Sequence, residues 1–147
     1  LEHVADPVRV LAEILRVTKI GGYAYVQAGP LYHSPFGHHM FSYFKDYPWI
    51  HLRKSKDDIK AYARERQIDI ALKRDLGVTS DEYIDGLFLE DYGLNEFQSR
   101  NDIKVTLSHT SYEGRELLTA DLLSEMHGYK PEHLVGHGFE IAFQRLR

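Results

Sequence analysis

DPVRVLAEILRVTKIGGYAYVQA, residues 6–28, carries the strongest structural signals of the chain. Asp6 suits a helix N-cap and Pro7 the first helical position, where the missing N–H costs nothing. Apolar residues then recur at the spacing of one helix face: Val8, Leu11, Ile14 and Leu15. The glycines at 21–22 end this helix, and the short apolar and aromatic run 23–28 before the next glycine predicts a buried strand.

Downstream of this unit the patterns predict further helices and two more strands. A Ser-x-x-Asp capping box at 55–58 opens a polar helix that runs to about residue 66. Residues 67–100 read as short helices separated by glycines. Ile103, Val105 and Leu107 alternate with polar neighbours and predict a strand. A helix over 118–126 and an alternating strand over 139–143 complete the chain.

The predicted order of elements is helix, strand, long mostly helical segment, strand, helix and strand. Strands that alternate with helices favour an α/β layered fold. Three strands make a small sheet, whose apolar faces and unpaired edges favour association, so we expect a homo-oligomer among the partners.

Composition limits the function classes. The chain has 147 residues, is 43% hydrophobic and 27% charged, and carries a net charge of -4 without a dense basic run. Such a profile indicates a globular domain and argues against direct binding of nucleic acid. No apolar run approaches the roughly 20 residues that span a bilayer, and no leader pattern opens the sequence, so we expect a cytoplasmic protein without membrane contact. The chain has no cysteine, which leaves histidines and carboxylates as reactive groups.

Four consecutive segments of the N-terminal region carry a family resemblance. They are Leu-Glu-His-Val at 1–4, Asp-Pro at 6–7, Arg-Val-Thr-Lys-Ile-Gly-Gly at 16–22, and the strand at 23–28. Together they resemble the middle of class I S-adenosylmethionine-dependent methyltransferases. The resemblance implies an α/β fold, a partial Rossmann-like methyltransferase fold that holds the C-terminal half of the sheet, with a mostly helical insertion. It also implies that 103–108 and 138–146 form the antiparallel hairpin of the last two strands.

The chain departs from that family at the glycine-rich loop that holds the cofactor. Backbone approach to the ligand requires residues without side chains there, and none of the eleven glycines forms such a loop behind a strand. The segment Gly136-His137-Gly138 runs into a strand instead of a helix, so it is not that fingerprint. We therefore expect 1–147 to be the C-terminal portion of one methyltransferase domain, with 35–100 as an inserted substrate-recognition region.

The resemblance also assigns a cofactor site. Leu1, Glu2 and His3 would form the floor of the S-adenosylmethionine pocket, where one strand ends. Ligands of open α/β sheets gather outside the carboxyl ends of strands, which agrees with this position. The alternative is a capped strand-to-helix turn with solvated Glu2 and His3.

The loop GPLYHSPFGHHMFSYFKDYPWIHL, residues 29–52, allows three interpretations. As a metal site it would use its four histidines, His33, His38, His39 and His51, although no ordered set of ligands completes a shell. As a catalytic loop it would present a neutral imidazole that accepts a proton near pH 7, with His38 or His39 as the base and His33 as third choice. As a structural loop it would only pack its aromatic rings.

The expected function is S-adenosylmethionine-dependent methyl transfer to a small-molecule or sugar acceptor, by an enzyme of which this chain is an incomplete part. Tyr32 and Trp49 would shape the acceptor pocket. Transfer to oxygen or nitrogen requires positioning, exclusion of water and removal of a proton. The alternative is a non-enzymatic interaction domain of methyltransferase-like fold.

Overall fold

The N-terminal helix and strand form as the sequence predicts. The structure, a computed structural model, describes residues 1, 4, 6–86 and 93–147. Helix α1 spans Pro7–Val17, and the carboxylate of Asp6 accepts a hydrogen bond of 2.9 Å from the backbone N–H of Arg9. Strand β1 spans Tyr23–Ala28. The predicted helix and strand are confirmed, but the strand is not buried as expected, because Tyr23 and Tyr25 are largely exposed.

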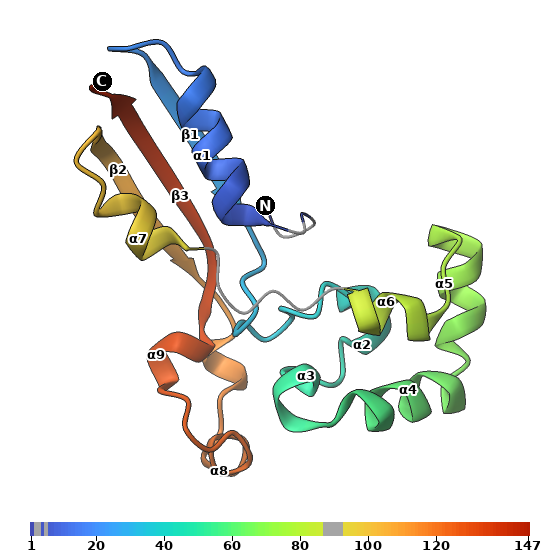
Figure 1. Ribbon diagram of the computed structural model, residues 1–147. Coiled ribbons are helices and arrows are strands. Elements are labelled where there is room, and N and C mark those ends of the chain that lie inside the picture. The colour runs from blue at the N-terminus through green and yellow to red at the C-terminus, as the bar shows by residue number, and fades with distance from the viewer. Residues whose placement is uncertain (2–3, 5, 87–92) are drawn as a thin grey trace.

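A three-stranded sheet holds the two ends of the chain together. Strands β2 (Ile103–Tyr112) and β3 (Gly136–Arg145) join β1 in the order β1-β3-β2. The central strand β3 pairs antiparallel with both neighbours, so that Ile141 lies opposite Val26 on one side and Ser108 on the other. Figure 1 shows β3 between the other two strands. The expected antiparallel pairing of the last two strands is therefore present.

The expected fold class, however, is wrong. A partial Rossmann-like methyltransferase fold requires a parallel sheet, whereas every pairing in the described residues is antiparallel. The physical reason is that a period-two pattern identifies a strand but not its direction. Long connections, such as the one from β1 to β2, can return a strand in either direction. The chain is a mixed α/β protein with a fully antiparallel sheet.

One face of the sheet is covered by helices. Helix α1 and helix α7 (Leu94–Gln98) lie on the same side of the strands in Figure 1. They bury a shared apolar core with the strands, which includes Leu11, Leu15, Val26, Phe97, Ile141 and Phe143. We call α1, α7 and the three strands the sheet unit. Burial of these side chains supplies its main stabilisation.

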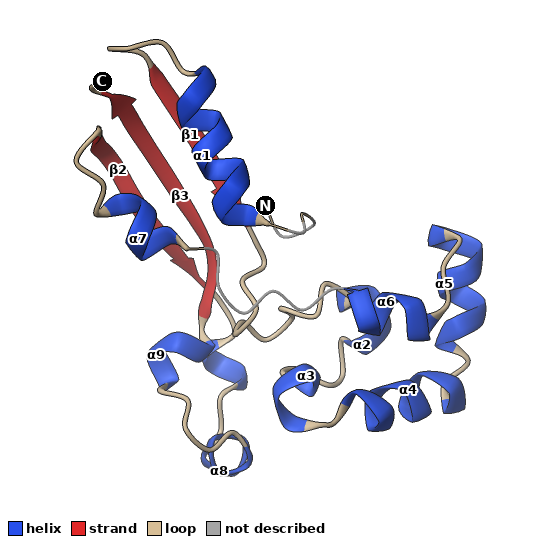
Figure 2. Ribbon diagram, in the orientation of Figure 1, coloured by secondary structure: helices blue, strands red, loops and turns tan. Residues whose placement is uncertain are grey.

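A second group of helices lies apart from the sheet, as Figure 2 shows. It contains α2 (Phe41–Phe44), α3 (Ile50–Arg53), α4 (Lys56–Glu65), α5 (Ile68–Leu76) and α6 (Ser80–Gly86). We call it the helical unit. Its own core comprises Met40, Phe44, Ile50, Ile59, Ala63, Ile68, Leu72 and Ile84. The capping box at Ser55 is confirmed, because its hydroxyl accepts from the N–H of Asp58 at 3.2 Å.

Short helices connect β2 to β3. They are a 3-10 turn at Arg115–Leu117, α8 (Ala120–Glu125) and α9 (Pro131–Leu134). The helix predicted over 118–126 is thus shorter than expected. A third cluster of Trp49, Met126 and Leu134 joins this connection to the helical unit. Within the described residues, no helix is both long enough and apolar enough to cross a bilayer.

Candidate functional site

The site forms where the chain leaves β1 and meets the start of β3. Gly29 lies so close to this strand that a Cβ on it would stand 3.2 Å from the Cα of Gly138. The N–H of Leu31 donates a hydrogen bond of 2.6 Å to the carbonyl of His137. The first residues of the loop are therefore fixed against β3, and their side chains project from a defined backbone.

Two pockets meet at His137. The first, about 300 Å³, lies at the junction of the three strands and is lined partly by Gln27, Ser111 and Glu140. The second, about 380 Å³, lies beside it and is lined by Pro30, Phe36, His39, Phe41, Glu113 and His137. His137 lines both pockets, so a ligand in either one can contact this residue.

The second pocket combines aromatic walls with polar groups. The rings of Phe36 and Phe41 meet edge to face with centroids 4.6 Å apart. Phe41 remains 56% exposed, which leaves an apolar surface that a ligand can cover. The polar groups of the pocket are two imidazoles and one carboxylate. Such a pocket can hold the apolar part of a small molecule and position one polar atom of it.

Glu113 and His137 form a pair across the pocket. The Nδ1 atom of His137 lies 2.7 Å from Oε1 of Glu113, and both side chains are a little over one-third exposed. Their backbones are set by the sheet, because the N–H of Glu113 donates to the carbonyl of Val135 at 2.9 Å. The sequence did not point to this pair, since β2 and β3 bring the two residues together only through their register.

His39, predicted as a candidate base, lies in the wall of the second pocket. Its backbone is in the left-handed region with φ of 59°, which is unfavourable for a residue with a Cβ. Its carbonyl accepts a hydrogen bond of 3.2 Å from the hydroxyl of Tyr83 in α6. The helical unit therefore holds His39 at the pocket.

His38, the other first-choice base, lies in the interior. Its side chain is fully buried, and its Nδ1 accepts the N–H of Met40 at 3.0 Å. Burial, with smaller contributions from the nearby His51 and His39, lowers the pKa of His38 to about 3. The ring of Phe36 packs on it with centroids 6.0 Å apart and itself lines the pocket. His38 is a neutral core imidazole that supports the pocket wall.

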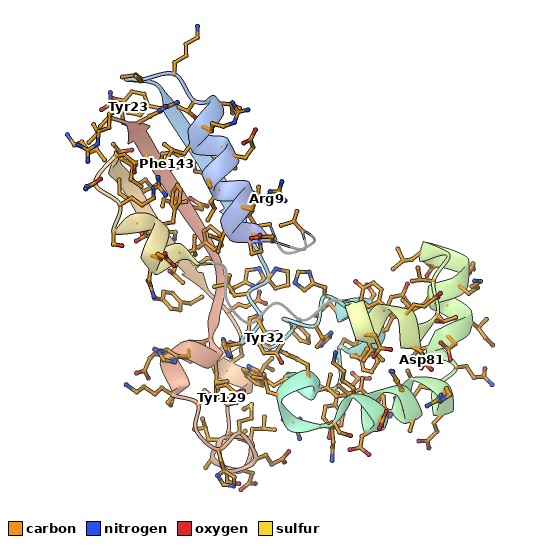
Figure 3. The ribbon with its side chains drawn as sticks, in the orientation of Figure 1. Arg9, Tyr23, Tyr32, Asp81, Tyr129 and Phe143 are labelled. Atoms are coloured by element: carbon orange, nitrogen blue, oxygen red, sulfur yellow. The ribbon has the colours of Figure 1, made fainter. Side chains whose placement is uncertain are left out.

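His33 and His51 both contact the ring of Tyr32. The ring of Tyr32 meets the ring of His33 at 5.2 Å and that of His51 at 5.1 Å. Nε2 of His51 bonds the carbonyl of Tyr32, and burial lowers the pKa of His51 to about 4. His33 is partly exposed, and its ring lies 5.3 Å from that of Tyr129. Figure 3 shows Tyr32 and Tyr129 on the side of the sheet unit where the connecting helices lie.

Trp49, predicted to shape the acceptor pocket, is a core residue. It is fully buried, and its indole N–H donates to the carbonyls of His33 at 3.1 Å and Leu134 at 3.0 Å. It therefore joins the loop after β1 to α9. Tyr32 lies closer to the surface but is not among the residues that line the second pocket.

Neither the metal site nor the cofactor site expected from the sequence is formed by the described residues. In the part of the chain that the structure describes, no group of three or more histidines and acidic residues could hold a metal ion. Of the predicted cofactor residues, Leu1 is partly buried against the core of the sheet unit, while Glu2 and His3 lie outside the described residues. Gly136 and Gly138 belong to β3, so the glycine-rich loop that would hold an adenosyl group is not formed there. The described residues do not fit that part of the methyl donor.

No protein-family model matches this chain. The comparisons with curated proteins and with solved structures also give no match. The functional argument therefore depends on the sequence segments and on the geometry of the two pockets.

Proposed function

We propose that this chain takes part in S-adenosylmethionine-dependent methyl transfer and contributes the pocket for a small-molecule or sugar acceptor. The observation that carries the proposal is the aromatic pocket of about 380 Å³, lined by two histidines, between the segment after β1 and the start of β3. That strand closes the N-terminal segment that resembles the methyltransferases. The pocket offers what an acceptor needs from the protein, which is positioning, shielding from water and a base.

The roles of the side chains follow from their positions. Phe36 and Phe41 cover an apolar face of the acceptor, and the imidazoles of His39 and His137 reach its polar atom. Neutral imidazole accepts a proton from a hydroxyl or an amine near pH 7. S-adenosylmethionine supplies the methyl group when it is bound.

The net charge of -4 and the lack of a basic patch in the sequence support a small acceptor over a nucleic acid. We place the activity in the cytoplasm, because methyl donor and small acceptors occur there together. Titration calorimetry of S-adenosylmethionine with the natural protein that carries this sequence tests the proposal. We expect saturable binding, and no heat at millimolar ligand would overturn it.

A second candidate function is supported by the open face of the sheet. Tyr23, Tyr25 and Leu107 are 67%, 56% and 41% exposed. Tyr25 and Leu107 both lie opposite Ala142 of β3, so their side chains share one row across the sheet. Exposed apolar rows of this kind mark interaction surfaces, which suits a non-enzymatic interaction domain or a homo-oligomer. Sedimentation of Tyr25→Lys beside the unchanged chain, at several concentrations, separates the two candidates, because an acceptor pocket does not need this face.

A further inference from the structure

We infer that the acceptor in the second pocket is a small cationic amine with an apolar body, and that Glu113 recognises its ammonium group. This inference rests on the proposed function and names the substrate class for it. A carboxylate and two phenylalanine rings line the same pocket of about 380 Å³. That combination suits an amine on an apolar carbon skeleton, because the rings cover the skeleton and the carboxylate attracts the charge.

Phe36 and Phe41 form the apolar wall of the pocket. Their rings meet edge to face with centroids 4.6 Å apart, and Phe36 also packs on the fully buried His38. Phe41 is 56% exposed and offers its surface to a ligand. A ligand that covers Phe41 removes apolar area from water, and the faces of aromatic rings attract a cation. An apolar body with one cationic group makes use of both properties.

Glu113 supplies the negative charge of the pocket. Its backbone N–H donates to the carbonyl of Val135 at 2.9 Å, which anchors the residue beside β3. Its side chain is 39% exposed, so a ligand can reach the carboxylate, of which Oε1 lies 2.7 Å from Nδ1 of His137. A carboxylate offers about four acceptor positions, so the contact with His137 leaves room for the N–H groups of an ammonium.

The charges around the pocket favour a cation over an anion. Among the described residues, neither of the two pockets that meet at His137 is lined by a lysine or an arginine, and the first pocket adds a second carboxylate at Glu140. A third pocket shares Glu113 and is lined by two further glutamates and one arginine, Arg115. Carboxylates thus outnumber cationic side chains around the three pockets, and the local potential attracts an ammonium group and repels a phosphate.

Anionic and polyhydroxylated acceptors fit the second pocket less well. Proteins recognise phosphates and carboxylates with arginine or lysine, which the described lining of this pocket does not contain. A sugar needs a polar partner for each hydroxyl that becomes buried. Pro30, Phe36 and Phe41 offer no such partner from their side chains. The inference therefore narrows the proposed acceptor from small molecules in general to amines.

Three ligands of similar shape test the charge preference: phenethylamine, phenethyl alcohol and hydrocinnamate. They are titrated into the natural protein at about pH 8, where imidazole is ordinarily neutral and phenethylamine is still a cation. The ring protons of Phe41 report binding by NMR. We expect phenethylamine to bind about ten times more tightly than phenethyl alcohol, and hydrocinnamate more weakly than both. Equal affinities for amine and alcohol, tighter binding of hydrocinnamate, or no response of Phe41 to any ligand would overturn the inference.

Glu113→Gln separates the charge of the pocket from its shape. The amide has nearly the same size without the charge, so phenethylamine should then bind no more tightly than phenethyl alcohol. Phe41→Ala should instead weaken both ligands by a similar factor, because it removes apolar cover. Asp121→Asn, at an exposed position in α8, is the matched control and should keep the preference for the amine. A preference that survives Glu113→Gln, or one that is lost in Asp121→Asn, would overturn the role of Glu113.

Calorimetry with S-adenosylmethionine separates this inference from the proposed function. If the methyl donor does not bind while the preference for the amine and its dependence on Glu113 are found, the proposed methyl transfer fails and the amine site stands. If the donor binds while Phe41 responds equally to the amine and the alcohol, the inference fails and the proposed function stands.

Discussion

The sheet unit and the helical unit each enclose a buried apolar core, but they assemble it in different ways. In the sheet unit the partners come from opposite ends of the chain, as in the pairing of Val26 with Ile141. In the helical unit the core residues all lie between Met40 and Ile84 and come from consecutive helices. The first core therefore depends on contacts between distant segments, while the second can form from neighbouring ones.

The candidate site lies between the sheet unit and the helical unit. Phe36, His39 and Phe41 line the pocket from the segment that leads into the helical unit and its first helix. His137 lines it from β3, and Glu113 from the position directly after β2. The hydrogen bond from Tyr83 to the carbonyl of His39 ties one side to α6. A change in either unit can therefore alter the pocket, and variants in each unit test how independent they are.

The largest expected effect comes from the central strand. Phe143 is fully buried, and its ring lies 5.0 Å from that of Phe97. Phe143→Ala should lower the free energy of unfolding by about 4 kcal/mol, because it leaves a cavity between the sheet and α7. The matched change in the helical unit is Leu72→Ala, at a fully buried position, with a loss of about 3 kcal/mol. Urea denaturation measures both losses.

Hydrogen exchange shows whether the two cores are separate. In Leu72→Ala, the amides of α4 and α5 should lose protection while those of β3 keep it. Equal loss of protection in β3 would mean that the two units unfold as one, and the contrast between them would not hold.

Acid should weaken the loop beside the helical unit before it affects the sheet. The pKa values of His38 and His51 fall from 6.5 to about 3 and about 4, mainly because the rings are buried. Between these values and 6.5 the unfolded chain binds more protons than the folded one, so stability is complete above pH 6.5 and falls as the pH decreases. Between pH 6.5 and pH 5, each ring should lower the free energy of unfolding by about 2 kcal/mol.

Urea denaturation at pH 7.5 and at pH 5 measures this loss. His38→Gln should reduce the difference between the two pH values, and His127→Gln, at an exposed position, should leave it unchanged. A stability that does not depend on pH in this window would contradict the burial of both imidazoles.

Trp49 joins the loop after β1 to α9, so a substitution at this residue tests how strongly these two segments are connected. Trp49→Phe removes the indole N–H that bonds the carbonyls of His33 and Leu134, and it leaves both without that donor in a buried place. We expect a loss of about 2 kcal/mol, measured by thermal unfolding. Tyr129→Phe removes an exposed hydroxyl nearby and should lower the midpoint little. Similar midpoints for the two variants would show that the indole hydrogen bonds do not hold this junction.

The smallest expected effects come from the helix caps. Asp6→Ala and Ser55→Ala each remove one side-chain acceptor from a helix start, at α1 in the sheet unit and at α4 in the helical unit. Each substitution should lower the free energy of unfolding by about 1 kcal/mol. Amide exchange at Arg9 and at Asp58 reports them one by one, and faster exchange at both amides in either single variant would show that the units are coupled.

Local signals in the sequence were sufficient for individual elements. The Asp-Pro start and the two glycines predicted α1 and β1, and the capping box predicted α4, because these signals act within a few residues. The direction of the strands was not predictable in this way. It is set by which distant segments pair, and the resemblance to the methyltransferases led to a parallel sheet that the structure does not have.

The site was predictable only in part. A histidine-rich loop after β1 pointed to the right region, and His39 does line the pocket. Counting histidines could not separate His39 from the buried His38, since adjacent residues differ in burial only after the loop has packed on Phe36. The pair of Glu113 and His137 depends on the register of β2 and β3, and the only hint was a histidine between two glycines at the start of a predicted strand.

S-adenosylmethionine carrying a ¹³C-labelled methyl group, added to the natural protein, tests the proposed methyl transfer most directly. We predict nuclear Overhauser contacts from the bound methyl group to ring protons of the second pocket, above all those of Phe41 and His39. These contacts should disappear when the unlabelled donor is added in excess. Binding with contacts only to residues outside both pockets, or no binding at all, would contradict the proposal.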